Sequence, residues 1–258
     1  CVRCNRVIKF GALLEKARGQ GLCFDRFATG HYARVERREQ DGRFLLRRGA
    51  DHRKDQSYFL CRLDQRQLAQ MLTPLGGMKK EDVKSLARQA GFLDLAEKAE
   101  SQNFIESRDY GVLFRGDDSR PGPIRDMSGR VVGEHHGLVH YTVGQRKRTG
   151  LSGSDSRLYG VKVDGPTNTI TVGPREALFS RSFQVGPVDW ISCDHPPEGP
   201  LRVKVQVRQQ HRAAAAVVQA RPDGAASVVC DEPQLAVTPG QAAVFYQDDC
   251  VIGAGTIA

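Results

Sequence analysis

The chain opens with Cys1-Val2-Arg3-Cys4-Asn5-Arg6-Val7-Ile8-Lys9-Phe10, which places two thiols three positions apart, immediately before an amphipathic run. Ile8, Leu13, Leu14 and Ala17 recur at helical spacing, and Gly19 follows as a stop signal, so we predict a helix with the cysteines on the loop that enters it. Backbone N–H groups at a helix start favour the thiolate, the reactive form of cysteine.

The Cys1-x-x-Cys4 spacing has three interpretations. The pair fits reactive sulfur chemistry, half of a metal or cluster site, or two small apolar residues. A zinc site normally uses a second pair, whereas the other cysteines stand alone in the sequence: Cys23, Cys61, Cys193, Cys230 and Cys250. We therefore favour a redox, persulfide or nucleophile pair.

Length, charge and cysteine usage limit the class of protein. The 258 residues suffice for two or three modules, and 38 basic against 30 acidic residues suggest a polyanionic partner. Seven cysteines without a signal peptide indicate a reducing cytosol, so we predict a cytoplasmic protein. No apolar run approaches the ~20 residues that cross a bilayer, which predicts no membrane partner. Because the chain begins with Cys, we expect it to be part of a longer protein.

Two polar stretches in the first hundred residues predict ligand contacts. Gly30 and His31 follow a predicted strand, where ligands of α/β sheets collect; Gly30 would allow close approach, and His31 would either contact phosphate or base or serve a structural role. Lys54-Asp55-Gln56 precedes an apolar helical run and is predicted to face outward at a helix start, a pattern that a merely solvated helix start also shows. Between these stretches, Asp41-Gly42 predicts a hairpin. After them, residues 79–91 predict a further helix.

The second half of the chain combines a basic loop with short strands. Three consecutive cations between glycines, Arg146-Lys147-Arg148, fit contacts along RNA phosphates. His135 and His136 are adjacent and cannot share a helix face, so we predict no metal site. Alternating strands predict a small closed β-barrel, over residues 158–163, 169–172, 201–207, 214–220, 226–229, 242–246 and 251–257.

Six ordered motifs give the chain a family resemblance. They are Cys4-Asn5-x-x-Ile8-Lys9-Phe10, Ala28-Thr29-Gly30-His31-Tyr32, Lys54-Asp55-Gln56-Ser57-Tyr58-Phe59-Leu60, Pro74-Leu75-Gly76, Tyr141-Thr142-Val143-Gly144-Gln145-Arg146-Lys147 and Thr238-Pro239-Gly240-Gln241. Their order resembles that in tRNA-specific 2-thiouridylases of the MnmA type, and the resemblance spans essentially the whole chain.

The resemblance implies both a fold and a reaction. The fold is α/β, with the carboxyl part of an ATP pyrophosphatase-type (adenine nucleotide alpha hydrolase-like) domain over residues 1–106. A small central tRNA-binding domain over 107–156 and a β-barrel over 157–258 would follow. The reaction adenylates the 2-oxygen of the wobble uridine of tRNA with ATP and Mg²⁺, then replaces that oxygen with persulfide sulfur. Its implied partners are tRNA and a persulfide donor, either a cysteine desulfurase or a relay protein.

The resemblance also assigns residues. Cys4 matches the catalytic cysteine, with Cys1 as its partner, and Gly30 matches a nucleotide-contacting glycine. The implied tRNA contacts are His31, Lys54, Asp55, Gln56, Gln145, Arg146, Lys147, Arg208 and Gln241. A planar adenylated uracil requires a soft nucleophile, which a terminal persulfide supplies better than a hydroxyl.

Two departures from the family pattern leave alternatives open. The glycine-rich ATP loop Ser-Gly-Gly-x-Asp-Ser is not present, so we expect the chain alone to be inactive. Many members also carry a Ser-x-x-Ile-Cys-Phe cysteine, where this chain reads Ser101-Gln102-Asn103-Phe104-Ile105. Cys1 is then either the substitute partner thiol or, with Cys4, an iron–sulfur ligand. The alternative function is a noncatalytic tRNA-binding or metal-binding fragment of such an enzyme.

Overall fold

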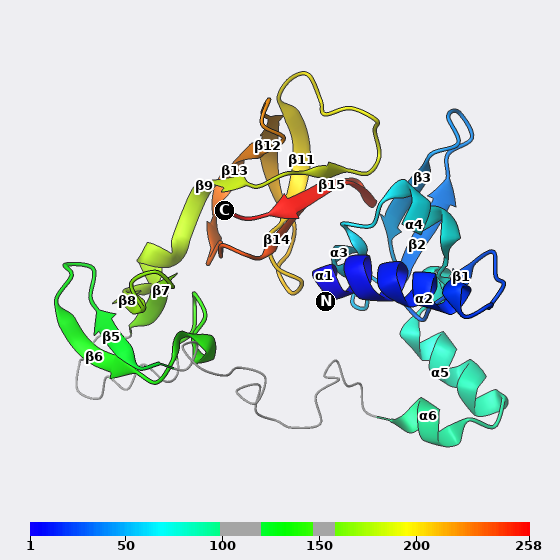
Figure 1. Cartoon of the computed structure of the whole chain (residues 1–258), viewed down its shortest axis with the longest axis horizontal. Coiled ribbons are helices and arrows are strands. Elements are labelled where there is room, and N and C mark those ends of the chain that lie inside the picture. The colour runs from blue at the N-terminus through cyan, green and yellow to red at the C-terminus, as the bar shows by residue number, and fades with distance from the viewer. Residues whose placement is uncertain (99–119, 147–157) are drawn as a thin grey trace. The chain divides into compact units, whose positions relative to one another are not determined.

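The structure is a computed structural model that describes residues 1–98, 120–146 and 158–258. The chain divides into two compact units (Figure 1). Unit 1 comprises Cys1–Ala99, Ser182–Glu232 and Pro239–Ala258, and unit 2 comprises Glu100–Arg181 and Pro233–Thr238. The beginning and the end of the chain therefore belong to one compact unit.

The first helical segment comprises α1 (Val2–Cys4), the π-helix η1 (Asn5–Ala12) and α2 (Leu13–Gly19), with a kink at Gly11, whose backbone angles (φ −116°, ψ −105°) are not helical. Its predicted end at Gly19 is confirmed. The predicted place of Cys4 on the entering loop is wrong, because the Asn5 amide already donates to the Cys1 carbonyl at 2.9 Å and Cys4 lies inside the helix.

The buried face of this segment also differs from the prediction. Phe10 and Leu14 are buried in the core, whereas Ile8 and Leu13 are 56% and 49% exposed. Hydrogen bonds from i to i+5 widen a π-helical turn, and the buried residues of η1, Asn5 and Phe10, are accordingly five positions apart. The segment packs on the core through the residues that this wider turn selects.

Unit 1 contains the remaining helices of the first hundred residues. They are α3 (Ser57–Leu60), α4 (Gln65–Gln70), the 3₁₀ helix η2 (Pro74–Gly77), α5 (Lys80–Gln89) and α6 (Leu93–Glu97). Asp64 caps α4 in a capping box with Gln67, which satisfies backbone donors at both positions. Helix α5 confirms the helix predicted over residues 79–91.

A nine-stranded sheet dominates unit 1 (Figure 1). Its path is β2-β3-β15-β14-β11-β12-β13-β9, and β10 pairs with β15. The bounds are β2 Ala33–Arg37, β3 Phe44–Arg48, β9 Phe179–Val185, β10 Asp189–Trp190, β11 Leu201–Gln206, β12 Ala214–Ala220, β13 Ala226–Leu235, β14 Ala242–Gln247 and β15 Cys250–Thr256. A separate parallel pair joins β1 (Phe27–Ala28) to β4 (Met71–Leu72).

The carboxyl-terminal strands close into the predicted barrel. A bridge between Val185 and Ile257, with the Gly186 amide donating to the Thr256 carbonyl at 2.7 Å, joins the end of β9 back to the end of β15. The predicted hairpin around Gly42 (φ +74°) forms β2 and β3, and it extends the barrel sheet where Arg47 pairs with Cys250 of β15.

One hydrophobic core unites these parts of unit 1. Phe10 and Leu14 of the first helix pack with Leu46 of the hairpin and with Tyr246 and Val251 of the barrel. All five side chains are almost completely buried, so the helix that carries Cys4 is held directly against the barrel and its attached hairpin.

Unit 2 holds a smaller sheet of order β6-β5-β8-β7 around Ile124, Ile170 and Val172. Its elements are β5 Gly122–Arg125, β6 Val131–His135, η5 Leu138–His140, β7 Tyr159–Asp164, β8 Thr169–Gly173 and η6 Arg175–Leu178. Strands β7 and β8 were expected in the barrel, but β8 pairs with β5 and with β7 instead. In the described ranges, no helix combines the length and the apolar character that crossing a bilayer requires.

Candidate active site

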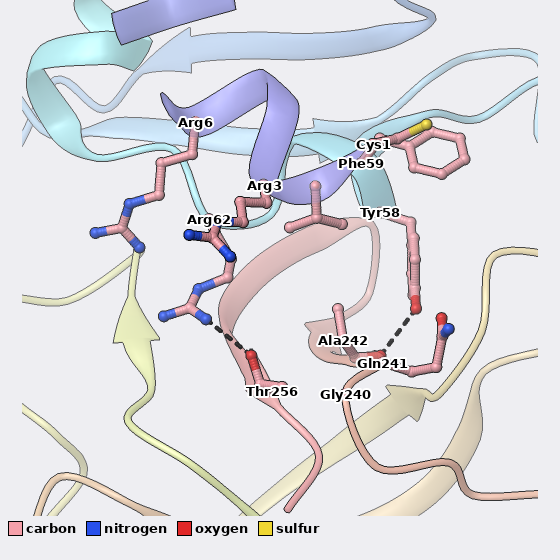
Figure 2. Close-up of a pocket in the computed structure, with 11 residues that line it drawn as sticks. Cys1, Arg3, Arg6, Tyr58, Phe59, Arg62, Gly240, Gln241, Ala242 and Thr256 are labelled. Carbon is pink, nitrogen blue, oxygen red and sulfur yellow. Dashed lines mark hydrogen bonds between the residues drawn. The ribbon is translucent and has the colours of Figure 1, made fainter. Parts of the chain in front are cut away.

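A pocket of about 620 Å³ opens on unit 1 where the first helix, α3 and the barrel meet (Figure 2). Its lining comes from both ends of the sequence: Cys1, Val2, Arg3, Arg6, Tyr58, Phe59, Arg62, Gly240, Gln241, Ala242 and Thr256. Cys1, a predicted catalytic residue, and Gln241, a predicted tRNA contact, therefore share one cavity although 240 positions separate them.

The second predicted catalytic thiol lies beside this pocket. Cys4 is half-buried in the first helix and is not one of the lining residues, whereas Cys1 is exposed. The next residue, Asn5, is buried and donates from Nδ2 to the Phe59 carbonyl at 3.0 Å. The asparagine of the Cys-Asn motif thus fixes the Cys4 turn against the aromatic wall of the pocket.

The aromatic wall is itself anchored to the barrel. The Tyr58 hydroxyl donates to the Ala242 carbonyl at 2.9 Å, next to Gln241, and the Tyr58 and Phe59 rings meet edge to face with centroids 5.8 Å apart. Burial raises the pKa of Tyr58, so its hydroxyl stays protonated and can hold this hydrogen bond. The phenol therefore positions the loop that carries Gln241.

Three arginines line the side of the pocket opposite these aromatic rings (Figure 2). Arg6 Nη1 and Arg62 Nε donate to the same oxygen, Oδ2 of Asp189, at 2.5 and 2.6 Å. Arg62 also donates from Nη1 to Thr256 Oγ1 at 3.0 Å. These residues were not predicted from the sequence. The spacing of Arg3 and Arg6 on one helix face was a usable signal, but their meeting with Arg62 and Asp189 depends on the tertiary fold.

His31 lies away from the residues that line this pocket. Its Nδ1 atom is hydrogen-bonded to the Thr29 hydroxyl at 2.7 Å, and its ring lies 6.2 Å from that of Phe10 between centroids. Burial, with a smaller contribution from the charge of Lys9, lowers the pKa of His31 to about 4. At neutral pH the imidazole is uncharged, so a contact to RNA would use hydrogen bonding or stacking.

We expect the ring resonances of His31 to titrate near pH 4 in the folded protein. Between pH 6.5 and 4 the imidazole of His31 is protonated in the unfolded chain but stays neutral in the native protein. Because the unfolded state binds more protons in this window, the free energy of unfolding should fall as the pH falls. An NMR titration measures the midpoint, and His31→Gln assigns the resonance and should reduce the stability loss. A midpoint near 6.5 would show that the ring is not desolvated.

Gly30, the predicted nucleotide contact, is exposed and precedes β2. A Cβ at this position would contact only Cδ1 of Leu75, at an ordinary 3.7 Å. This geometry does not identify a phosphate cradle at Gly30, so the nucleotide contact remains a prediction from the sequence motif.

The predicted outward orientation of Lys54-Asp55-Gln56 is wrong for Asp55. Its carboxylate is 6% exposed and accepts hydrogen bonds from Arg48 Nη1 at 2.8 Å, from the Gly49 amide at 3.0 Å and from the Ser57 hydroxyl at 2.9 Å. Gln56 is half-buried and accepts from the Tyr32 amide through Oε1 at 2.9 Å. Asp55 and Gln56 therefore join the hairpin to the start of α3, while Lys54 and Gln56 both remain partly exposed to solvent.

The remaining predicted RNA contacts lie outside the pocket. Gln145 belongs to unit 2, where its Oε1 accepts from the Thr142 amide at 3.0 Å, and Arg146 is exposed. Lys147 lies outside the described residues. Arg208 is half-buried in unit 1, and burial lowers the pKa of its guanidinium.

The cysteine pair does not by itself fit a metal or cluster site. Cys1 and Cys4 supply two thiols, and no group of three or more His, Cys, Asp or Glu side chains gathers in the part of the chain that the structure describes. His135 is buried, with its two ring nitrogens bonded to the Asn168 carbonyl at 3.0 Å and the Gly137 amide at 3.1 Å. Its contacts explain it as a structural residue of unit 2.

Three family models match successive parts of the chain. They are described as a tRNA methyl transferase HUP domain over residues 1–106, a tRNA methyl transferase PRC-barrel domain over 113–174, and an aminomethyltransferase beta-barrel domain over 180–257. These matches agree with an α/β part, a small central sheet and a carboxyl-terminal barrel.

Curated relatives match across the entire chain. A tRNA-specific 2-thiouridylase MnmA of Chloroflexus aggregans is 46% identical over 263 residues, which covers 100% of this chain and 72% of the relative. The proteins of the same name from Pelotomaculum thermopropionicum and Endomicrobium trichonymphae are 43% and 40% identical, again over 100% of this chain and over 70% and 71% of the relatives.

Proposed function

We propose that this chain, which belongs to the MnmA family of tRNA-specific 2-thiouridylases, takes part in replacing the 2-oxygen of the tRNA wobble uridine by sulfur. The observation that carries this proposal is the pocket shared by Cys1 and Gln241. A modifying enzyme must bring its reactive group and its RNA contact to the same base, and this pocket brings the two predicted residues together.

We assign the sulfur chemistry to Cys4 and Cys1. A persulfide on Cys4 attacks C2 of the adenylated uracil with its terminal sulfur, and the bond from C2 to the 2-oxygen breaks as that oxygen leaves with AMP. Cys1 then attacks the Cys4 sulfur, so the sulfur–sulfur bond to the product breaks and 2-thiouridine leaves with its sulfur. The electron pair for this cleavage comes from the Cys1 thiolate, which leaves a Cys1–Cys4 disulfide that a cellular thiol reduces.

ATP is the proposed co-substrate that converts the 2-oxygen into a leaving group, with Mg²⁺ as the companion of its phosphates. The nucleotide would bind between the cysteine-bearing helix and the partly buried Phe59 ring, whose neighbour Tyr58 is held by its hydrogen bond to Ala242. The helix and the ring form the wall against which a flipped-out uracil would stack, beside the turn that carries Cys4. We assign Gln241 to a polar contact with the same nucleotide.

Other cations are assigned to the body of the tRNA. Arg146 and Lys147 of the basic loop would contact the phosphate backbone, as would Lys54 and Arg208, and His31 would contribute a neutral hydrogen bond. The sulfur would arrive from a persulfide-carrying protein, and a cytoplasmic location would give access to both partners.

A thiolation assay tests the proposed function. The protein, expressed with whatever coding sequence flanks residues 1–258, is incubated with unmodified tRNA, ATP and a cysteine desulfurase with cysteine as the persulfide source, and thiouridine is measured by mass spectrometry of the digested tRNA. We expect thiouridine only when ATP and a sulfur source are both present, and only at the wobble position. Transfer of a methyl group, or no change in the tRNA, would reject the assignment.

A further inference from the structure

The arginine side of the pocket has no part in the function proposed so far. Arg3 and Arg6 lie one turn apart on the first helix, and Arg62 follows α3 (Figure 2). Among the described residues that line the pocket, none is acidic. The nearby Asp189 carboxylate offsets one of the three guanidinium charges, which leaves a net charge of two positive units on this side.

Arg62 and Asp189 hold Arg6 in place on the arginine side of the pocket. Each of the three side-chain nitrogens of Arg62 is directed at a protein acceptor: Nε at Asp189 at 2.6 Å, Nη1 at Thr256 Oγ1 at 3.0 Å, and Nη2 at the Pro187 carbonyl at 3.5 Å. These contacts leave Arg62 little capacity for a ligand, but they fix the carboxylate to which Arg6 is bound.

Arg3 and Arg6 keep donor groups for a ligand. Arg6 uses Nη1 for Asp189, and its other two side-chain nitrogens have no acceptor among the described residues. The Arg3 side chain is exposed, and its guanidinium makes no hydrogen bond or ion pair with the residues that the structure describes. Two adjacent guanidinium groups with unused N–H donors match the oxygens of a phosphate, which they can bind in a fork-like, bidentate way.

We propose that Arg3 and Arg6 bind a backbone phosphodiester of the tRNA beside the nucleotide whose base enters the pocket. This inference rests on the proposed function, because it takes the base to lie on the side of Phe59 and Cys1. The phosphate then lies on the opposite, arginine side, so the two sides fix the direction in which the nucleotide enters. Arg3 is exposed, which suits a polymer whose chain continues beyond the pocket.

Salt-dependent tRNA binding tests the assignment. Filter binding of tRNA between ~50 and ~200 mM salt is compared for the wild type, Arg3→Ala, Arg6→Ala and the double variant. Each lost phosphate contact should reduce the salt slope by about one, so we expect a reduction of about two for the double variant, with weaker binding. Arg66→Ala is the matched control, because Arg66 is 67% exposed, pairs with Glu15 and lies outside the pocket.

The variants distinguish loss of a phosphate contact from loss of folding and from loss of nucleotide binding. Arg3→Ala removes no hydrogen bond or ion pair with a described residue, so we expect the variant to remain folded, whereas Arg6→Ala also removes one of the two arginines that bind Asp189. An unchanged slope in the double variant overturns the proposal. A raised KM for ATP with an unchanged slope also overturns it, because the phosphate would then belong to a nucleotide. Absence of thiouridine formation by the wild type would reject the proposed function without affecting the slope measurement.

Discussion

Replacing Cys4 by serine is expected to reduce thiouridine formation by on the order of a thousandfold or more, as the loss of other covalent nucleophiles does. A serine hydroxyl is essentially un-ionised at neutral pH and cannot carry a persulfide. The fold should tolerate the change, because Cys4 is only half-buried and the contact that holds its turn is made by Asn5. The measurement is thiouridine formed per enzyme with a cysteine desulfurase and cysteine as the persulfide source, beside a melting curve of the variant.

Cys1→Ser distinguishes the possible roles of the second thiol. If Cys1 resolves the Cys4 intermediate, its loss should be nearly as damaging under single-turnover conditions. Cys23→Ser is the matched control, because Cys23 is also exposed and lies outside the pocket. Full activity of Cys1→Ser would reject the pair and leave Cys4 as a single nucleophile. Loss of activity together with iron bound after anaerobic purification would favour a cluster instead.

Asp55→Ala is expected to lower the free energy of unfolding by about 3–5 kcal/mol, the range for breaking one side of a buried ion pair. The substitution leaves the Arg48 guanidinium, 19% exposed, without its carboxylate. It also removes the acceptor of the Gly49 and Ser57 amides, each at 3.0 Å. The same guanidinium lies over the Tyr246 ring, 3.7 Å from its centroid, so the loss of Asp55 also affects the contact between hairpin and barrel. Urea unfolding followed by circular dichroism measures the loss.

An exposed ion pair supplies the control for Asp55. Glu15 pairs with Arg66 at 3.3 Å while both side chains are about two-thirds exposed, at 66% and 67%, so Glu15→Ala should change stability little. If Asp55→Ala unfolds like the wild type but binds tRNA much more weakly, the carboxylate faces RNA in the working protein and the structural role assigned to it is wrong.

Local signals predicted the elements that local chemistry determines. Gly19 ended the first helix, Asp41-Gly42 made the hairpin turn, and acidic residues opened α5. These features depend on backbone freedom at glycine and on charges within one turn, which are visible in a short stretch of sequence.

The errors arose where the deciding partner is distant in sequence. A polar stretch before a helix looks the same whether water or Arg48 satisfies Asp55, so its burial could not be predicted. Alternating apolar residues identified β7 and β8 as strands but not their partner β5. The candidate site shows the same limit: its cysteines and Gln241 were found through motifs, whereas the meeting of Arg62 with Asp189 required the fold.

The hairpin β2–β3 pairs with β15 although the family models assign these strands to different domains. Its residues share one core with the barrel and the first helix. The boundaries of sequence similarity therefore do not mark independent folding modules in this protein. A recombination event that exchanged the barrel alone would have to supply a matching edge for β3, which ties inheritance of the barrel to that of the cysteine-bearing end.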